Sequence, residues 1–379
     1  MSTIDIITGA QYGSEGKGHV TAQLVHRYNH DGERTTNIRV AGPNAGHTVI
    51  DEGGMAFPLR TIPVGAAINH DADLYIAPGS EIDLEVLHQE ILTLRQAGHP
   101  VRNLYVSGEA TLLTQKHKDR ETEMDMHGTI GSTGKGIGAA RADRIMRTGE
   151  RIIDNWEART LITALKAQIL TAPEHLLFMA NQLNQHNRHI LIEGTQGYGL
   201  GLHAGRYPQC TSSDARAIDF LGMAGISPWA PGVERVTPWL VARVYPIRVA
   251  GNSGPLEGET SWEQLGLPEE KTTVTHKVRR VGEWDAKLMR EAAVANGIAV
   301  HQYGMPPTNY NAPGRVALTM VDQKIPQIHG LSNLDDADDD TQDLVWELIR
   351  DVESNAGTKV GMFTTSADTC IWNEGQVDW

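Results

Sequence analysis

The stretch Ile4–Gly18, IDIITGAQYGSEGKG, decides the fold of this chain of 379 residues. Ile4, Ile6 and Ile7 form a short β-branched run that is typical of a strand, and glycines follow it directly. Apolar residues then recur at helical spacing over residues 20–28. Loop amides, a helix N-terminus and the lysine at position 17 together favour a bound phosphate. The stretch therefore predicts an enzyme that handles nucleotide phosphates.

The glycine loop departs from the Walker pattern at both ends. Gln11 stands where the first glycine of that pattern belongs, and Gly18 replaces the hydroxyl residue that binds magnesium. An ordinary tight turn between strand and helix is therefore the alternative interpretation of this loop.

Strand and helix patterns alternate along the rest of the chain. Short apolar runs predict strands at 74–77, 104–107, 189–192, 241–249 and 316–321. Helical spacing predicts helices around 84–94, 161–169, 285–296 and 342–352. No linker or internal repeat divides the chain. We expect an α/β fold with one large domain, residues 1–379, built around a central, mainly parallel sheet with loop and helical excursions.

Composition excludes several classes of protein. The chain carries 33 basic and 47 acidic residues, a net charge of −14, which argues against a surface for nucleic acid or anionic membranes. Cys210 and Cys370 lie far apart, so neither a disulfide framework nor a zinc site is expected. No apolar run reaches membrane-spanning length, and the first residues do not resemble a signal peptide. We expect a cytoplasmic protein. The acidic run at 335–340 is interpreted as a solvated surface rather than a metal site.

Three further glycine loops carry polar groups: GPNAGHT (42–48), GSTGKGIG (131–138) and EGTQG (193–197). His47 in the first loop is a candidate acid, since imidazole titrates near neutrality, although a lone histidine is more often a hydrogen-bonded or surface residue. The second loop mixes hydroxyls with a cation and is followed by Arg141, Arg144 and Arg147, which favours phosphate. The third loop (193–197) offers neutral donors and acceptors that suit a base edge or phosphate oxygens. The alternative is that these polar groups only stabilise a turn or cap a helix.

A fifth segment, TTVTHKVRR (272–280), runs from hydroxyls into cations. Arginine binds a carboxylate through two parallel hydrogen bonds, so a dicarboxylate suits this loop. An exposed basic turn that balances nearby acids is an equally common explanation.

Taken in order, GAQYGSEGKG, GPNAGHT, GSTGKGIG, EGTQG with the downstream YPQCTSSD, and TVTHKVRRVGEWD resemble the signature loops of the adenylosuccinate synthetase family. The resemblance implies an adenylosuccinate-synthetase-like, P-loop-related fold, a homodimer and Mg²⁺. It also implies a ligase: a nucleoside triphosphate phosphorylates the 6-oxygen of a purine monophosphate, and the amino group of L-aspartate then displaces phosphate.

The resemblance also implies site residues. Lys17, His47 as general acid and Ser14 carry the catalytic positions. The triphosphate is implied at Gly13, Glu15, Gly16, Lys17, Gly18, Gly46, His47, Thr48 and Asp322. The purine monophosphate is implied at Ser14, Asn44, Ser132, Thr133, Arg147, Gln196 and Thr211, with Arg147 reaching the site of the neighbouring subunit. Aspartate is implied at Thr273, Val274, Thr275, Lys277, Arg279 and Arg280, and the metal at Ser14 and the Gly46 carbonyl.

Ser14 is the main departure from the family pattern, which has an aspartate there that takes the proton from purine N1 and helps to bind magnesium. A serine of ordinary pKa is a poor base near neutral pH, so another group, water or the substrate must assist. Serine at this position resembles the bacteriophage branch of the family, which converts dGMP to N6-succino-2-amino-2′-deoxyadenylate for 2-aminoadenine DNA. A shorter side chain leaves room for the exocyclic amine of guanine.

Two further departures concern the triphosphate and the sugar. The family reads guanine with a lysine and an aspartate, but LTMVD (318–322) keeps only the aspartate, and TSAD (365–368) replaces a glycine and proline loop. We therefore expect ATP or dATP. Lys277 replaces an arginine that contacts ribose and aspartate in the family pattern. The planar guanidinium, which can form two parallel hydrogen bonds, is thereby replaced by the single compact charge of an ammonium group.

The leading hypothesis is thus a ligase of L-aspartate and dGMP, located in the host cytoplasm if phage-encoded. The alternatives are ordinary adenylosuccinate synthesis from IMP with GTP, and a catalytically dead nucleotide-binding regulator. Retention of His47 and of the cationic loop argues against the regulator, since a nucleotide sensor needs neither.

Overall fold

The computed structural model describes residues 2–271, 277–299 and 314–373. Contacts divide them into two compact units. The first unit consists of the chain up to Ile7 with Lys17–Thr195 and Ala217–Val236. The second consists of Thr8–Gly16, Gln196–Arg216 and the described residues from Thr237 onward.

The largest group of strands in the first unit is parallel and has the order β1-β10-β2-β5-β7-β9. Their bounds are β1 (Ser2–Gly9, of which Ser2–Ile7 belong to this unit), β10 (Arg188–Glu193), β2 (Arg34–Arg39), β5 (Asp73–Ile76), β7 (Leu104–Ser107) and β9 (Gln168–Leu170). In the register of β10 and β2, Glu193 lies opposite Arg39 at the last position of both strands. The carboxyl ends of parallel strands meet at one sheet edge, so two charged side chains meet there.

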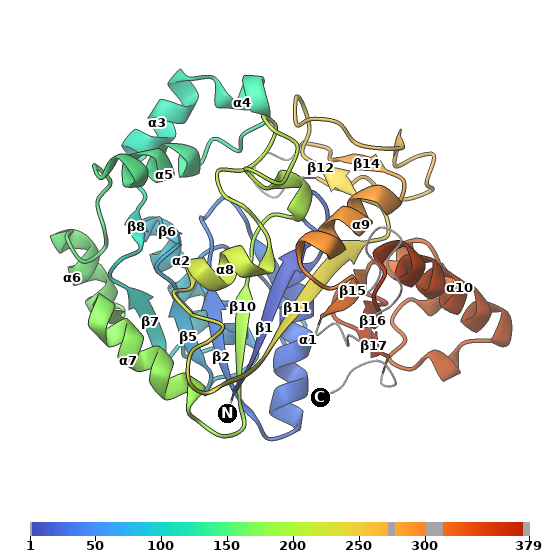
Figure 1. Ribbon diagram of the computed structural model, residues 1–379, viewed down its shortest axis with the longest axis horizontal. Coiled ribbons are helices and arrows are strands. Elements are labelled where there is room, and N and C mark those ends of the chain that lie inside the picture. Colours follow the sequence, from blue (N-terminus) through green and yellow to red (C-terminus); the bar gives the residue numbers. More distant parts are fainter. Residues whose placement is uncertain (1, 272–276, 300–313, 374–379) are drawn as a thin grey trace. The chain divides into compact units, whose positions relative to one another are not determined.

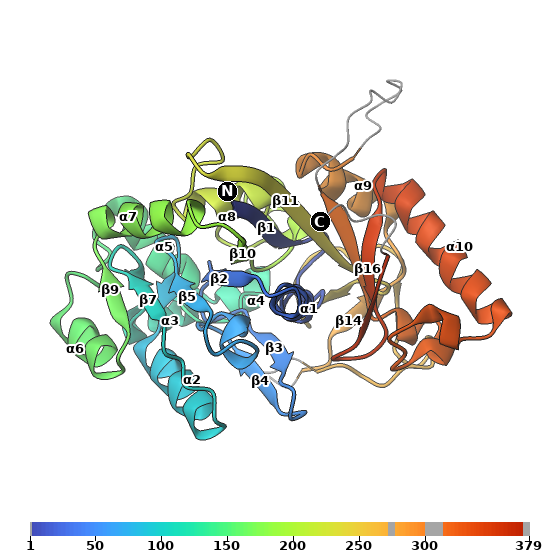
Figure 2. The same cartoon turned by 90° about the horizontal axis from the view of Figure 1, so that it is seen from below.

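Successive side chains of each strand point to opposite faces of this sheet, and both faces are covered by helices. Leu74, Ile76 and Val106 pack in a cluster with the apolar face of α2 (Leu84–Gln96), while Tyr75 packs against Phe178 of α7 (Ala172–Leu183). Figure 2 accordingly shows α2 and α7 on opposite sides of β5 and β7. The other elements of the unit are α1 (Lys17–His30), β3 (His47–Ile50), β4 (Ala56–Leu59), η1 (Val64–Ala67), β6 (Glu81–Ile82), β8 (Thr111–Leu112), α3 (Gln115–Glu123), α4 (Met126–Ile130), α5 (Ile137–Met146), α6 (Trp156–Ala164) and α8 (Ala217–Met223).

The second unit is built on β11 (Val233–Arg243, of which Thr237–Arg243 belong to this unit), β15 (Arg315–Thr319) and β16 (Val360–Thr364), which run parallel, with β17 (Cys370–Trp372) antiparallel at the edge. Apolar residues of α9 (Ala286–Ala295) and α10 (Asp339–Ala356) share one core with these strands, and Figure 1 shows both helices beside them. Short elements complete the unit: η2 (Tyr198–Leu200), β12 (Ile247–Arg248), β13 (Glu259–Thr260), β14 (Arg280–Gly282), η3 (Val321–Gln323), η4 (Pro326–Ile328) and η5 (Leu334–Asp336).

The α/β class and the mainly parallel sheet are confirmed. Two predicted elements are wrong. The expected strand at 241–249 ends at Arg243, because Pro246 lacks the amide that a sheet interior requires, and residues 247–248 join a separate small sheet. The expected helix at 161–169 ends at Ala164, and residues 168–170 form β9, because Lys166 takes a left-handed φ of 61° that breaks the helix. A single domain over 1–379 stays a prediction.

The acidic run at 335–340 has a structural role. Asp338 caps α10, its carboxylate accepting from the Thr341 amide at 2.8 Å, and Asp339 and Asp340 lie in the first turn, where the helix dipole favours negative charge. Among the described residues no cluster of His, Cys, Asp or Glu is placed to hold a metal ion. The same residues include no helix long and apolar enough to cross a membrane.

Candidate active site

The glycine loop Gly9–Gly16 follows β1 and leads into α1. The Glu15 carboxylate lies inside this loop and accepts hydrogen bonds from the amides of Gly13 at 2.8 Å and Gln11 at 3.2 Å. Gly13 and Gly16 both take a φ of +87°, where a side chain is strained. Ser14 also has a positive φ, 56°, and is the exposed residue of the loop. The loop therefore presents the serine hydroxyl outward and keeps the neighbouring carboxylate inside.

Arg279 reaches this serine from the predicted aspartate loop, its guanidinium donating to the Ser14 hydroxyl. Burial lowers the pKa of Arg279, and Glu270 opposes that effect. The predicted residues Thr273, Val274 and Thr275 lie outside the described residues. The glycine loop and the described end of the aspartate loop are thus in direct contact.

Arg280, the next predicted aspartate residue, is hydrogen-bonded within the chain. Its Nε and Nη2 donate to the two carboxylate oxygens of Glu259 at 2.6 and 2.5 Å, and its Nη1 donates to the Gly254 carbonyl at 2.7 Å. All three guanidinium nitrogens are thus engaged in hydrogen bonds that join β14 to Glu259 and Gly254. The role of Arg280 in binding aspartate stays a prediction.

A buried arginine that sequence reasoning missed lies beneath the glycine loop. The Arg243 backbone exchanges two hydrogen bonds with the Gln11 side chain, at 3.0 and 3.1 Å, and its guanidinium forms a two-point ion pair with Glu270. The pair joins the end of β11 to the segment that precedes Arg279. Arg243 ends an apolar strand, which is the one signal in the sequence that marks it.

A second cluster, in the first unit, surrounds His47, which begins β3. We call Arg39, His47 and Glu193 the histidine cluster. Glu193 Oε2 lies 3.1 Å from His47 Nδ1 and 3.1 Å from Arg39 Nη1, and Arg39 also contacts Nδ1 directly. The three side chains are 0–6% exposed, so their charges interact without water between them.

Burial dominates the electrostatics of the histidine cluster. It raises the pKa of Glu193 to about 7, against the opposing effect of Arg39. Burial together with the positive charges of Arg39 and Lys17 holds the pKa of His47 well below its usual range. In the protein without ligands His47 is therefore neutral at pH 7. A bound phosphate brings negative charge and shifts this balance towards the protonated ring.

Lys17 and Gly18 begin α1 and are both buried. A Cβ atom on Gly18 would lie 2.6 Å from the Cβ of His47, so only glycine lets the helix approach the histidine this closely. The predicted triphosphate residues Lys17, Gly18 and His47 are thus brought together in one unit. Gly46 and Thr48, on either side of His47, are exposed.

The loop at 131–138 is occupied by a carboxylate of the chain itself. Glu121 of α3 accepts from the amides of Gly136 at 2.9 Å and Gly138 at 2.8 Å, and from the Ser132 hydroxyl at 3.3 Å. Such donors are of the kind that a phosphate would use, and Thr133 in the same loop is exposed. The roles of Ser132 and Thr133 in binding the purine monophosphate stay predictions.

Of the three arginines that follow this loop, two are committed to ion pairs. Arg141 donates to the Glu81 carboxylate at 2.6 and 3.2 Å, and Arg144 Nη2 lies 3.5 Å from the Glu109 carboxylate. Arg147 caps α5 with a φ of 63° and is exposed. It is therefore the arginine of this run that faces outward.

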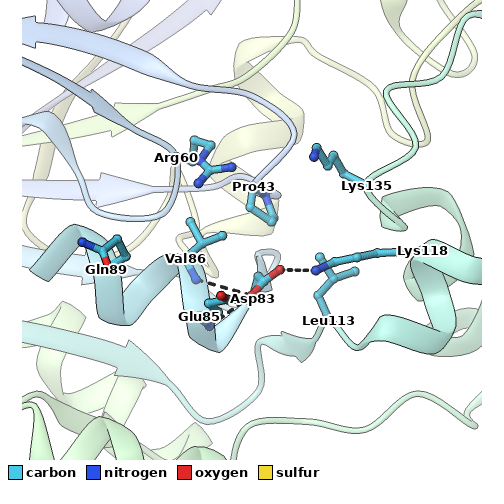
Figure 3. Close-up of a pocket in the computed structure, with 9 residues that line it drawn as sticks. All are labelled: Pro43, Arg60, Asp83, Glu85, Val86, Gln89, Leu113, Lys118 and Lys135. Atoms are coloured by element: carbon cyan, nitrogen blue, oxygen red, sulfur yellow. Dashed lines mark hydrogen bonds and ion pairs between the residues drawn. The ribbon is translucent and has the colours of Figure 1, made fainter. Parts of the chain in front are cut away.

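A cavity of about 270 Å³ lies beside the loop that carries Asn44. Arg60, Lys118 and Lys135 reach it from three segments, and Lys118 is paired with Asp83 at 2.7 Å, as Figure 3 shows. The other lining residues are Pro43, Glu85, Val86, Gln89 and Leu113. The cavity opens next to a loop for which the purine nucleotide is predicted.

The remaining predicted residues are divided between the units. Asn44 is half-buried in the first unit. In the second unit Gln196, at a φ of 60°, lies beside Gly13, and the Thr211 amide donates to the Leu200 carbonyl at 2.8 Å. Asp322 accepts from His329 Nδ1 at 2.8 Å. The roles given to these side chains stay predictions.

A mainly parallel α/β fold with a glycine loop ahead of a helix, a buried lysine, and a buried histidine beside an arginine and a glutamate is typical of a nucleotide-dependent enzyme. The profile of the adenylosuccinate synthetase family matches residues 6–176 and 174–301. The chain belongs to the adenylosuccinate synthetase family, and it is a carbon–nitrogen ligase of that type.

Relatives come from two branches. An adenylosuccinate synthetase of Pyrococcus horikoshii is 31% identical over 367 residues, 96% of each chain. An N6-succino-2-amino-2′-deoxyadenylate synthase of Vibrio phage phiVC8 is 32% identical over 299 residues, 77% of this chain and 82% of the phage protein. Sequence identity alone therefore does not separate the branches.

Solved structures of both branches share the fold. The cyanophage S-2L succinoaminodeoxyadenylate synthetase, bound to dGMP and to dATP as an energy donor, matches with a TM-score of 0.74, 25% identity and coverage of 98% of this chain and 95% of that one. An adenylosuccinate synthetase of Plasmodium falciparum matches with the same TM-score at 20% identity, covering 97% and 99%.

Proposed function

We propose that this ligase joins L-aspartate to dGMP with ATP or dATP as phosphoryl donor and forms N6-succino-2-amino-2′-deoxyadenylate. The observation that carries the proposal is Ser14, a hydroxyl at the exposed tip of the glycine loop where the family pattern has a carboxylate. The phage relative and the cyanophage structure, whose names state this product and these nucleotides, support it.

The proposed reaction has two steps. The purine 6-oxygen attacks the γ-phosphorus of the triphosphate, N1 gives up its proton and the diphosphate leaves. The aspartate amine then attacks C6 and gives up a proton, and inorganic phosphate leaves. Lys17 neutralises charge on the transferring group, His47 donates a hydrogen bond or proton at the 6-oxygen, and Arg279 with Lys277 holds the aspartate carboxylates.

The base for purine N1 is not Glu15. Its carboxylate is fully buried and accepts from two loop amides, so it faces into the loop rather than towards a ligand. With Ser14 as the neighbouring side chain and Arg279 on its hydroxyl, the loop offers no carboxylate to N1. This arrangement favours water or the substrate itself as the proton acceptor.

An adenine donor is supported by the state of Asp322. In the family an aspartate and a lysine read guanine together, whereas here the lysine is absent and the Asp322 carboxylate already accepts from His329. A guanine edge would have to compete with that histidine, and competition for a hydrogen-bond acceptor lowers affinity.

Magnesium is proposed as the cofactor, held by the Gly46 carbonyl and by phosphate oxygens. Gly46 is exposed and carries no side chain over its carbonyl, which fits a hard cation. The Ser14 hydroxyl fits less well, because Arg279 contacts it. When bound, the ion neutralises charge on the phosphoryl group in transfer.

A homodimer in which Arg147 serves the neighbouring site is also proposed. Arg147 is exposed, and Ile145 and Met146 beside it are 69% and 70% exposed, which a soluble surface seldom leaves uncovered together. Mixing inactive Arg147→Ala and His47→Ala proteins is expected to restore about a quarter of wild-type turnover, since half of the exchanged dimers are mixed and each has one complete site. Two dimeric variants that restore nothing on mixing would contradict a shared site.

The test of the proposal offers purified protein dGMP, GMP or IMP with aspartate, Mg²⁺ and either ATP, dATP or GTP, and detects succinylated product by mass. We expect product from dGMP with an adenine nucleotide. Preference for IMP with GTP would support ordinary adenylosuccinate synthesis, and triphosphate binding without any product would support a regulator. A cytoplasmic location, in the host if the protein is phage-encoded, accompanies the proposal.

A further inference from the structure

The loop at residues 131–138 surrounds a carboxylate of the neighbouring helix α3. Glu121 is 3% exposed, and both of its oxygens accept hydrogen bonds from the loop. Oε2 accepts from the Gly136 amide at 2.9 Å and from the Ser132 hydroxyl at 3.3 Å, and Oε1 accepts from the Gly138 amide at 2.8 Å. Converging donors of this kind make a site for an anion, and here the anion belongs to the chain itself.

Burial makes the Glu121 carboxylate dependent on these donors. A buried carboxylate is unfavourable unless it is hydrogen-bonded, and the three loop groups together with the N-terminus of α5 supply that stabilisation. A substrate phosphate that took the same amides would leave Glu121 buried without hydrogen-bond partners, which costs free energy. The contact between Glu121 and the loop is therefore expected to persist when a nucleotide binds.

Packing against α3 also explains two glycines of the loop. Gly136 has a φ of 82°, and a Cβ atom on it would lie 2.8 Å from the backbone nitrogen of Lys118. A Cβ atom on Gly138 would lie 3.2 Å from Oε1 of Glu121. Glycine at these two positions lets the loop approach the helix, and a bound phosphate is not needed to explain it.

Helix α3 is held in place by contacts that do not involve the loop. It begins with a capping box, which stabilises its first turn. Lys118 donates to Asp83, the N-cap of α2, at 2.7 Å, and Arg120 donates to Asp143 in the middle of α5 at 2.6 Å. The Glu121 carboxylate is therefore a fixed point to which the loop is attached.

The loop conformation that Glu121 holds leaves Thr133 exposed. Ser132, the residue before it, is fixed through its backbone and its side chain. Its amide donates to the Met126 carbonyl at 3.1 Å, its carbonyl oxygen lies 2.8 Å from His127 Nδ1, and its hydroxyl accepts from the Gly134 amide at 3.2 Å while donating to Glu121. The loop thus turns its amides towards α3 and a threonine side chain towards solvent.

We propose that Glu121 is a positioning residue for the purine monophosphate. Its carboxylate keeps the amides of Gly136 and Gly138 in the presence and absence of substrate, and it thereby holds the loop in the form that presents Thr133 to the nucleotide. The inference rests on the proposed binding of a purine monophosphate at Thr133, but not on which purine is accepted. The nucleotide then binds a loop that is already ordered, which lowers the entropy cost of binding.

The test replaces Glu121 by glutamine, which keeps the shape but turns one acceptor oxygen into an NH₂ group that cannot accept from an amide. The loop is then correctly formed in a smaller fraction of the molecules, and KM for the purine monophosphate should rise about 10-fold. We expect kcat and the KM of triphosphate and aspartate to change less than about twofold, because saturating nucleotide restores the loop. Glu121→Asp, which keeps the charge, should raise KM by less.

The sign of the change in KM separates this role from its opposite. If Glu121 only filled a phosphate site and left it when substrate bound, Glu121→Ala would free the amides of Gly136 and Gly138, and KM for the nucleotide would fall. A fall in KM in any of the three variants overturns the proposal, and so does an unchanged KM in both Glu121→Gln and Glu121→Ala.

Glu90→Gln is the matched control. Glu90 is also buried, 8% exposed, and accepts from three backbone amides, those of Arg60, Thr61 and Ile62 at 2.6, 3.0 and 3.0 Å. Both variants should unfold at a lower temperature than the wild type, because each loses hydrogen bonds to a buried carboxylate. Only Glu121→Gln should raise KM for the purine monophosphate. An equal rise in the two variants would reduce Glu121 to a structural residue.

A second measurement does not depend on turnover. Amide hydrogen exchange of the 131–138 segment, followed by mass spectrometry without substrates, should be about 10-fold faster in Glu121→Gln than in the wild type and in Glu90→Gln, because two amides lose a buried acceptor. Unchanged exchange overturns the proposal whichever purine the enzyme accepts. A wild-type protein that prefers IMP contradicts only the dGMP proposal, and KM is then compared with IMP.

Discussion

Replacing His47 by alanine is expected to lower kcat by about 10²- to 10⁴-fold, the range that a positioned acid contributes. The His47 ring is proposed to donate at the 6-oxygen, and alanine removes this ring together with its contacts to Arg39 and Glu193. Nucleotide affinity should change by about threefold or less, because Lys17 and the loop amides remain. Single-turnover kinetics with separate binding titrations measure the two quantities.

His99→Ala is the control for this experiment. His99 is also buried, 8% exposed against 6% for His47, and pairs with Asp51 at 2.9 Å in the same unit without touching the histidine cluster. Loss of turnover shared equally by both variants would reduce His47 to a structural residue. Turnover that survives in His47→Ala would remove it from the catalytic groups.

Replacing Ser14 by aspartate is expected to reverse the purine preference. A carboxylate at this exposed position can take the N1 proton of IMP, so activity with IMP should rise by about 10²-fold, the lower end of what a general base contributes. Activity with dGMP should fall, because the longer side chain fills the space proposed for the exocyclic amine. Comparison of kcat/KM for both purines in each protein measures the change.

Ser14→Ala separates charge from size at this position. Alanine removes the hydroxyl that Arg279 contacts but adds no bulk, so the preference for dGMP should persist. If Ser14→Asp keeps the wild-type preference while remaining active, the residue at position 14 does not select the purine.

The sequence predicts those helices, strands and turns that are determined by residues close together in the chain. The strand, glycine loop and helix at residues 4–28 were predicted from β-branched residues, glycines and helical spacing, and β1 and α1 lie there. The strand predicted at 104–107 has the bounds of β7. Where the pattern failed, a backbone feature decided: Pro246 and the left-handed Lys166 ended elements whose apolar residues continue.

The ion pairs at the site were beyond sequence reasoning, since they join residues far apart in the chain. Glu193 and Arg39 meet because β10 and β2 are neighbours in a given register, and no local pattern gives that register. Glu121 meets Gly136 and Gly138 through the packing of α3 and α5. The sequence therefore predicts the glycine loops, but it does not predict which arginine side chains are already paired with a carboxylate of the chain.

The most direct test of the central claim is the ratio of kcat/KM for dGMP to that for IMP, measured with aspartate, Mg²⁺ and ATP on the wild-type protein. The proposed function predicts a ratio well above one, with a succinylated diaminopurine deoxynucleotide as the product seen by mass. A ratio below one, with adenylosuccinate as the main product, would contradict it.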